Sequence, residues 1–77
     1  MKKIIGSVEY NTEQSARLYQ YVEGAFGDPR GFEESLYQTP DGKLFLYVNG
    51  GPDSPYPQEN IKRISKAKAD EWRTLRK

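Results

Sequence analysis

A strong turn signal, Thr39-Pro40-Asp41-Gly42, lies near the middle of this 77-residue chain. Proline presets the first corner of a β-turn, aspartate bonds to the nearby backbone, and glycine accepts a positive φ angle. Phe32–Thr39 before the turn and Lys43–Asn49 after it are rich in aromatic and aliphatic residues, as strands are. The sequence therefore predicts a β-hairpin, with Gly42 at positive φ.

The second strand of this hairpin is apolar at every position from Leu44 to Val48. A strand without alternation is typical of the centre of a sheet, where both faces are covered. Asn49-Gly50-Gly51-Pro52 ends it.

The first part of the chain predicts a strand and then a helix. Apolar residues alternate with polar ones over Lys3–Tyr10, which favours a strand, and Gly6 marks a bulge or a close backbone contact. Asn11-Thr12-Glu13-Gln14 resembles a helix start, so we expect a helix over about Thr12–Glu23. Its apolar face would comprise Ser15, Leu18, Tyr19, Val22, Ala25 and Phe26.

The last part predicts a short edge strand over Ile61–Ile64 and a second helix that begins after Ser65 and ends near Arg76. Ala69, Trp72 and Leu75 (or Arg76) share one face of this helix. We expect Trp72 to be buried against the sheet, beside the Leu18/Val22 face of the first helix.

Together these elements predict one α+β domain over residues 1–77. It combines an antiparallel sheet of three or four strands with two helices, in the order β-α-β-β-(β)-α.

Several classes of function lack the residues they need. The chain has no cysteine and no histidine, which removes disulfides, thiolate metal sites and the commonest general base. Glu33 and Glu34, with Asp28 nearby, are better interpreted as a solvated rim than as a metal site, because strand neighbours point to opposite faces. We expect no catalytic residues, no cofactor and no metal. The absence of a long apolar run predicts a soluble protein with no membrane partner, and a chain without cysteine suits the reducing cytoplasm.

Charge is unevenly distributed along the chain. Residues 61–77 contain seven basic and two acidic side chains, a net charge of +5, whereas residues 1–60 carry −4. The basic segment would suit nucleic-acid binding, with Trp72 stacking on a base. A solvated helix face with Trp72 in the core is the alternative, and the total charge of +1 favours it.

Six tyrosines are many for so short a chain, and tyrosine is enriched in protein interfaces. We therefore predict a partner-binding surface that combines hairpin tyrosines with charged residues. The candidates are Glu33, Glu34, Tyr37, Tyr47, Arg73 and Arg76.

Scattered motifs along the chain resemble a known group of proteins. They are Tyr10-Asn11-Thr12-Glu13, then Glu34-x-Leu36-Tyr37-x-Thr39-x-x-Gly42-x-x-Phe45-Leu46-Tyr47-x-x-Gly50-Gly51, then Ile64 and Ala69-x-x-Trp72. This pattern is similar to small uncharacterised proteins carried by phages, plasmids and other mobile elements of bacteria, although relatives commonly have Ala where this chain has Ser15. The resemblance implies an accessory protein that binds a host protein, such as an inhibitor of a CRISPR effector. Nucleic-acid binding through the basic C-terminal helix is the alternative.

Overall fold

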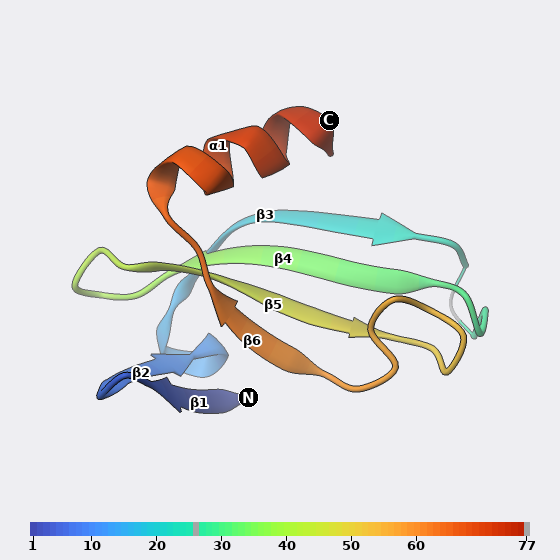
Figure 1. The fold of residues 1–77 in the computed structure, drawn as a ribbon, viewed down its shortest axis with the longest axis horizontal. Helices are drawn as coiled ribbons and strands as arrows, with labels where there is room; N and C mark the ends of the chain where they lie inside the picture. Colours follow the sequence, from blue (N-terminus) through green and yellow to red (C-terminus); the bar gives the residue numbers. More distant parts are fainter. Residues whose placement is uncertain (26, 77) are drawn as a thin grey trace.

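The computed structural model describes residues 1–25 and 27–76. Four antiparallel strands form one sheet in chain order: β3 (Ala16–Glu23), β4 (Phe32–Gln38), β5 (Leu44–Gly50) and β6 (Asn60–Arg63). The helix α1 (Lys66–Leu75) lies on one face of this sheet, and a separate two-stranded sheet, β1 (Lys2–Ile5) with β2 (Val8–Asn11), lies on the other (Figure 1). We call the face of the four-stranded sheet that α1 covers the helix side, and the face that the β1–β2 hairpin covers the hairpin side.

The predicted central hairpin is confirmed. β4 and β5 pair with Tyr37 opposite Phe45, and the amide of Gly42 donates to the carbonyl of Thr39 at 2.9 Å. Gly42 has a φ of 91°, a conformation that costs glycine nothing and most other residues a great deal. β5 is a central strand, and Phe45 from one of its faces and Val48 from the other are both buried.

The single strand expected over Lys3–Tyr10 is instead two strands joined by a tight turn. Gly6 and Ser7 both have positive φ, 54° and 69°, as a two-residue type I′ turn requires. The chain reverses there, so that Ile5 pairs with Val8. The alternating residues on either side of Gly6 are therefore in strands, as predicted, but the glycine is a turn and not a bulge.

The helix expected over Thr12–Glu23 is wrong. Asn11 does cap a helical start, since its side chain accepts from the amide of Glu13 at 2.9 Å, but only the 3-10 turn Thr12–Gln14 follows. The rest is β3, an edge strand that pairs with β4 from Ala16 to Glu23. Pairing in a sheet buries part of Tyr19 and Tyr21 on the helix side and leaves Leu18 and Val22 exposed. Phe26, which completed the expected helical face, lies outside the described residues.

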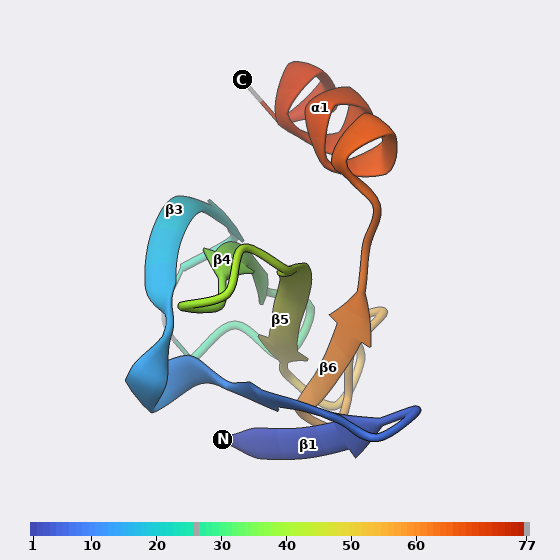
Figure 2. The ribbon, with the colours of Figure 1, turned by 90° about the vertical axis from the view of Figure 1, so that its left-hand side faces the viewer.

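Over the described residues, the expected order therefore changes to six strands, with a 3-10 turn after the second, followed by the helix α1. Each face of the four-stranded sheet has its own core. On the hairpin side, Tyr10 packs with Phe45 and Ile61, and on the helix side Leu36 packs with Ala69 and Trp72. Figure 2 shows the sheet between the two layers.

The last strand and the last helix agree with the prediction. β6 pairs only with β5 within the described sheet, and the hydroxyl of Ser65 accepts from the amide of Lys68 at 3.2 Å as the helix cap. Trp72 is buried as expected, with 8% of its surface exposed. It does not lie beside Leu18 and Val22, however, which are 44% and 59% exposed. Among the described residues no helix is both long and apolar enough to cross a membrane.

Candidate functional site

A buried carboxylate lies between the sheet and α1. Glu34 is 3% exposed and points to the helix side of β4. Its Oε1 accepts from Nε1 of Trp72 at 2.9 Å and from Nε of Arg76 at 2.8 Å. Its Oε2 accepts from the hydroxyl of Tyr56, in the connection between β5 and β6. Two separate parts of the chain, the end of α1 and the β5–β6 connection, therefore converge on one side chain of β4.

The charge of Glu34 is stabilised where it lies. Burial alone would raise the pKa of this carboxyl, but the hydrogen bonds from Tyr56, Trp72 and Arg76 outweigh burial, so the pKa lies below its ordinary value of 4.5. The hydrogen bond to Glu34 raises the pKa of Arg76. Burial and the hydrogen bond to Glu34 raise the pKa of Tyr56 to about 12. The cluster is an ionised pair with its polar atoms bonded, as buried charges require.

Aromatic rings surround the Arg76 end of this cluster. The guanidinium carbon of Arg76 lies 4.6 Å from the ring centroid of Tyr21 and 5.9 Å from that of Phe32. The hydroxyl of Tyr19 donates to the carbonyl of Arg76 at 2.8 Å. These contacts hold the end of α1 on β3 and β4. The expectation that Glu34 belongs to a solvated rim is therefore wrong, and Glu34 and Arg76 are bonded to each other inside the fold.

Glu33 points to the opposite, hairpin side of the sheet, as alternation along a strand requires. It accepts from Nε2 of Gln20 and from Oγ of Ser35, both at 2.7 Å. Ser35 pairs with Tyr47 across the strands, and the hydroxyl of Tyr47 donates to Oε2 of Glu59 at 2.8 Å. Burial raises the pKa of Tyr47 to about 12, with further contributions from the Glu59 hydrogen bond and the charges of Glu59 and Glu33.

Two tyrosine rings and two carboxylates thus share the hairpin side. Tyr37 is stacked on Phe45, with ring centroids 5.3 Å apart and planes inclined by 8°. Tyr37, Tyr47 and Glu33 are all half-buried, and Glu59 is exposed. We call this set the acidic tyrosine surface: Glu33, Tyr37, Tyr47 and Glu59.

Sequence reasoning found three of these residues and missed Glu59. Glu59 stands two positions before Ile61, which pairs with Tyr47. Its proximity follows from the register between β5 and β6, and the proline-rich segment that precedes β6 contains no signal for that register.

Among residues 61–76, the basic side chains do not form one patch. Lys66 and Arg73 are seven residues apart and lie on one flank of α1, while Lys68 lies on the other flank and pairs with Glu71 at 3.6 Å. Arg73 lies over the ring of Tyr19, 5.8 Å from its centroid, on the helix side. Arg73 and Glu33 are consequently on opposite faces of the sheet and cannot contribute to one contact surface.

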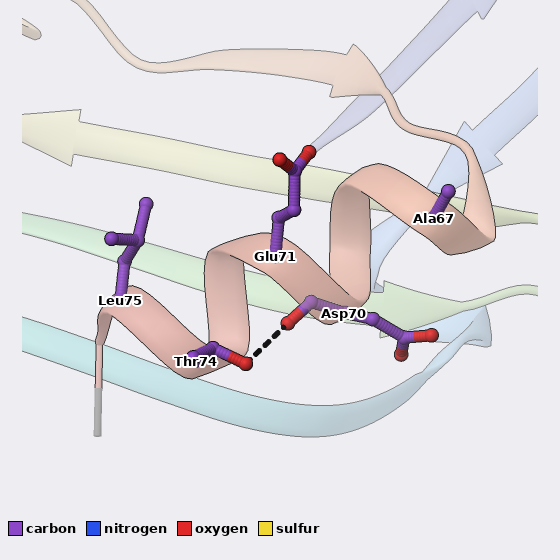
Figure 3. Close-up of a pocket in the computed structure, with 5 residues that line it drawn as sticks. All are labelled: Ala67, Asp70, Glu71, Thr74 and Leu75. Atoms are coloured by element: carbon purple, nitrogen blue, oxygen red, sulfur yellow. Dashed lines mark hydrogen bonds between the residues drawn. The ribbon is translucent and has the colours of Figure 1, made fainter.

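The outward side of α1, between these two flanks, is not basic. Figure 3 shows the side chains that line a shallow pocket there, and Leu75 among them is 80% exposed. The residues that line this pocket are Ala67, Asp70, Glu71, Thr74 and Leu75. This side of the helix is therefore partly apolar and partly acidic, and it interrupts the basic residues on the two flanks.

Within the described part of the chain, no group of three or more Asp, Glu, His or Cys side chains is arranged to hold a metal ion. The fold and these contacts define a small α+β domain whose helix α1 is bonded to a four-stranded antiparallel sheet through a buried carboxylate. No family model, curated protein or solved structure matches this chain.

Proposed function

We propose that this chain is a cytoplasmic protein-binding module of a mobile genetic element that acts without catalysis, by blocking a host defence enzyme such as a CRISPR effector. The observation that carries the proposal is the acidic tyrosine surface, in which the ring of Tyr47 lies beside the carboxylates of Glu33 and Glu59. The mobile-element origin rests on the sequence pattern described above.

The tyrosines suit a contact surface because their rings are already held in place. Tyr37 is stacked on the buried Phe45, and the hydroxyl of Tyr47 is bonded to Glu59. Side chains that are ordered before binding lose little conformational entropy when a partner arrives. Tyrosine is also among the residues that contribute most to interface hot spots.

The carboxylates indicate the charge of the partner. Enzymes that act on nucleic acids bind phosphates with clusters of Lys and Arg, so their grooves are basic. An acidic surface on a small protein complements such a groove and speeds the encounter. Direct binding of nucleic acid is less well supported, because Arg76 is bonded to Glu34 and the other basic side chains of the described C-terminal residues are spread over β6 and two flanks of α1.

The test is a plasmid-interference assay in cells that contain an active CRISPR effector, followed by affinity measurement on the effector that is inhibited. The wild-type chain is expected to restore plasmid transformation. Tyr47→Ala, and separately the pair E33K/E59K, should abolish this effect, with affinity falling at least about 30-fold for a central tyrosine.

The matched controls reverse a charge elsewhere on the domain. Glu13→Lys lies in the 3-10 turn and Asp70→Lys on the outward side of α1, and both residues are exposed. These variants should keep full inhibition, and every variant is checked for folding by tryptophan fluorescence. Loss through Lys66→Glu and Arg73→Glu alone, together with a steep salt dependence on free DNA or RNA, would establish nucleic-acid binding instead.

A further inference from the structure

A second pocket lies where the end of β6, the start of β5 and the start of α1 come together, at the left-hand end of the molecule in Figure 1. Its volume is about 420 Å³. The polar side chains that line it are Tyr10, Lys43, Arg63 and Ser65, and no carboxylate is among the described residues that form its wall. We call it the basic pocket.

Strand geometry brings the two cations to this pocket. Arg63 lies directly opposite Phe45 in the pairing of β6 with β5, so its side chain leaves the sheet on the hairpin side, where Phe45 is buried. Lys43 precedes Phe45 by two positions, which places it on the same face. Among the described residues, no carboxylate lies within ion-pair distance of Arg63, whereas Lys43 pairs with Asp41 at 2.8 Å. The guanidinium of Arg63 is therefore available to a ligand.

The start of α1 supplies a further donor. The amide of Ile64 donates to the carbonyl of Leu44 at 3.2 Å, and this bond holds the neighbouring Ser65 beside the start of β5. The hydroxyl oxygen of Ser65 accepts from the amide of Lys68, so its own proton can be donated to a ligand. The N-terminal end of this ten-residue helix also carries a partial positive charge, which stabilises a nearby anion.

Tyr10 is the independent observation that points to a ligand. Only 5% of its surface is exposed, and its ring packs against Phe45 with centroids 5.4 Å apart. Among the described residues, its hydroxyl bonds to no other side chain or backbone group, although every polar side-chain atom that is fully buried there has a partner. The hydroxyl must therefore be the part of this buried residue that reaches the open space of the pocket. It is a donor without an acceptor, beside two cations.

We propose that the basic pocket binds a phosphate group, either as the free ion or as the monoester of a small molecule. Phosphate carries a charge of about −1.5 to −2 at neutral pH and has three or more oxygens that accept hydrogen bonds. Four donors from separate parts of the chain suit such a ligand, since a carboxylate has only two oxygens and one charge.

The surroundings favour an isolated phosphate group over a nucleic-acid backbone. A backbone needs further cations along its path. Lys62, next to Arg63, lies over the ring of Tyr56 at 5.4 Å, and Arg73 lies over the ring of Tyr19 on the helix side. Neither continues the basic pocket, so one phosphate group is the ligand that its charge can match.

The test is a titration of the ¹⁵N-labelled full chain with sodium phosphate at constant ionic strength, followed through its amide chemical shifts. The amides of Lys43 and Ser65 should shift with a Kd of about 1 mM, because one exposed site binds a small ion weakly. Sodium acetate and sodium chloride at the same ionic strength should produce much smaller shifts. Phosphate-induced shifts no larger than those with chloride or acetate overturn the proposal.

Two variants remove one donor each. Tyr10→Phe deletes only the hydroxyl, and Arg63→Gln deletes the charge; each should weaken phosphate binding at least about tenfold, as expected for hydrogen bonds to a charged group. Because the Tyr10 hydroxyl has no partner among the described residues, Tyr10→Phe should leave thermal unfolding in phosphate-free buffer unchanged. The matched control Arg30→Gln removes an exposed arginine of the β3–β4 connection and should bind as the wild type does. Wild-type affinity in both Tyr10→Phe and Arg63→Gln overturns the proposal.

A third variant should strengthen binding. Asp41→Asn removes the carboxylate that pairs with Lys43, so affinity for phosphate should rise about two- to fivefold, the range of an exposed ion pair. A loss of affinity in this variant would contradict the role given to Lys43.

The source of the phosphate is distinguished by comparing a nucleoside 5′-monophosphate, the unphosphorylated nucleoside and inorganic phosphate. Tighter binding of the monophosphate than of the other two identifies a phosphorylated small molecule, and equal affinity for the monophosphate and inorganic phosphate identifies the free ion. An oligonucleotide without terminal phosphates that binds through Arg63 while inorganic phosphate does not would overturn the proposal in favour of nucleic acid.

The basic pocket is independent of the proposed function, because none of the residues of the acidic tyrosine surface lines it. Tyr47→Ala should abolish inhibition and leave phosphate binding unchanged, and Tyr10→Phe should do the reverse. The two proposals therefore fail separately.

Discussion

The indole N–H of Trp72 donates to Oε1 of Glu34 at 2.9 Å, between residues 38 positions apart in the chain. The bond joins α1 to the second strand of the sheet and lies in the interior. Arg76, one turn further along the chain, bonds the same oxygen. The orientation of α1 on the sheet therefore depends on one carboxylate, and the stability predictions begin there.

Trp72→Ala is expected to lower the free energy of unfolding by about 3–5 kcal/mol, because it leaves a large cavity between α1 and Leu36. Trp72→Phe leaves a smaller cavity than Trp72→Ala and removes the hydrogen bond, which is worth about 1.5–3 kcal/mol when the acceptor is charged. Urea unfolding followed by circular dichroism measures both. A Trp72→Phe variant as stable as the wild type would contradict the assignment of the N–H bond to Glu34.

Glu34→Ala should cost about 3 kcal/mol, near the lower end for breaking a buried ion pair, since the Arg76 side chain is 31% exposed and keeps contact with water. Glu34→Gln should cost less, because an amide oxygen still accepts from the indole. The matched control is Glu33→Ala, on the opposite face of the same strand, where only a small change is expected. Similar losses at the two positions would be inconsistent with a buried role for Glu34 alone.

Stability should fall in acid because of Glu34. Its pKa is lower in the folded chain than the ordinary value of 4.5, so its contribution is fully present above that pH and is lost as the pH falls through the folded value. The measurement is the free energy of unfolding from neutral pH to acid, for the wild type and for Glu34→Gln. The difference between the two curves should shrink as the carboxylate becomes protonated, and a constant difference would refute the linkage.

Two tyrosine hydroxyls should lose their protons at a higher pH than an ordinary tyrosine. The pKa values of Tyr47 and Tyr56 are both raised from 10 to about 12, by burial first and then by hydrogen bonds to Glu59 and Glu34. Because the neutral form is favoured in the folded state, the stabilisation is present below pH 10 and is lost as the pH rises through 12. Phenolate absorbance follows the titration. Tyr47→Phe and Tyr56→Phe should each remove one hydroxyl with a raised pKa. An unchanged phenolate titration curve would argue against the hydrogen bond of that tyrosine to its glutamate.

Gly42→Val should destabilise the hairpin by about 1–3 kcal/mol, the usual cost of holding a non-glycine residue at a strained φ. Among the described residues other than its two chain neighbours, no atom lies within 4 Å of the position that a Cβ would take at this glycine, so the cost comes from the backbone and not from a clash. Asp41→Asn is expected to lower the stability much less, since Asp41 is exposed and the residues around it are unchanged. Thermal unfolding of both variants provides the test, and a neutral Gly42→Val would contradict the positive φ.

Local sequence determined those elements whose signal needs no distant partner. The turn at Gly42 and the cap at Ser65 each depend on a few adjacent residues, because the backbone groups that they satisfy lie within four positions. The unbroken apolar run Leu44–Val48 likewise identified a central strand, since only a strand covered on both faces keeps such a sequence stable. These features were predicted correctly.

Tertiary contacts decided the rest. Residues 16–23 carry apolar side chains that suit a helix at one spacing and a strand at another, and pairing with β4 selected the strand. The burial of Glu34 followed from Trp72 and Arg76, which arrive from the far end of the chain and replace water around its carboxylate. No short-range pattern contains that information, because the free energy of burying a charge depends on which donors the completed fold brings to it.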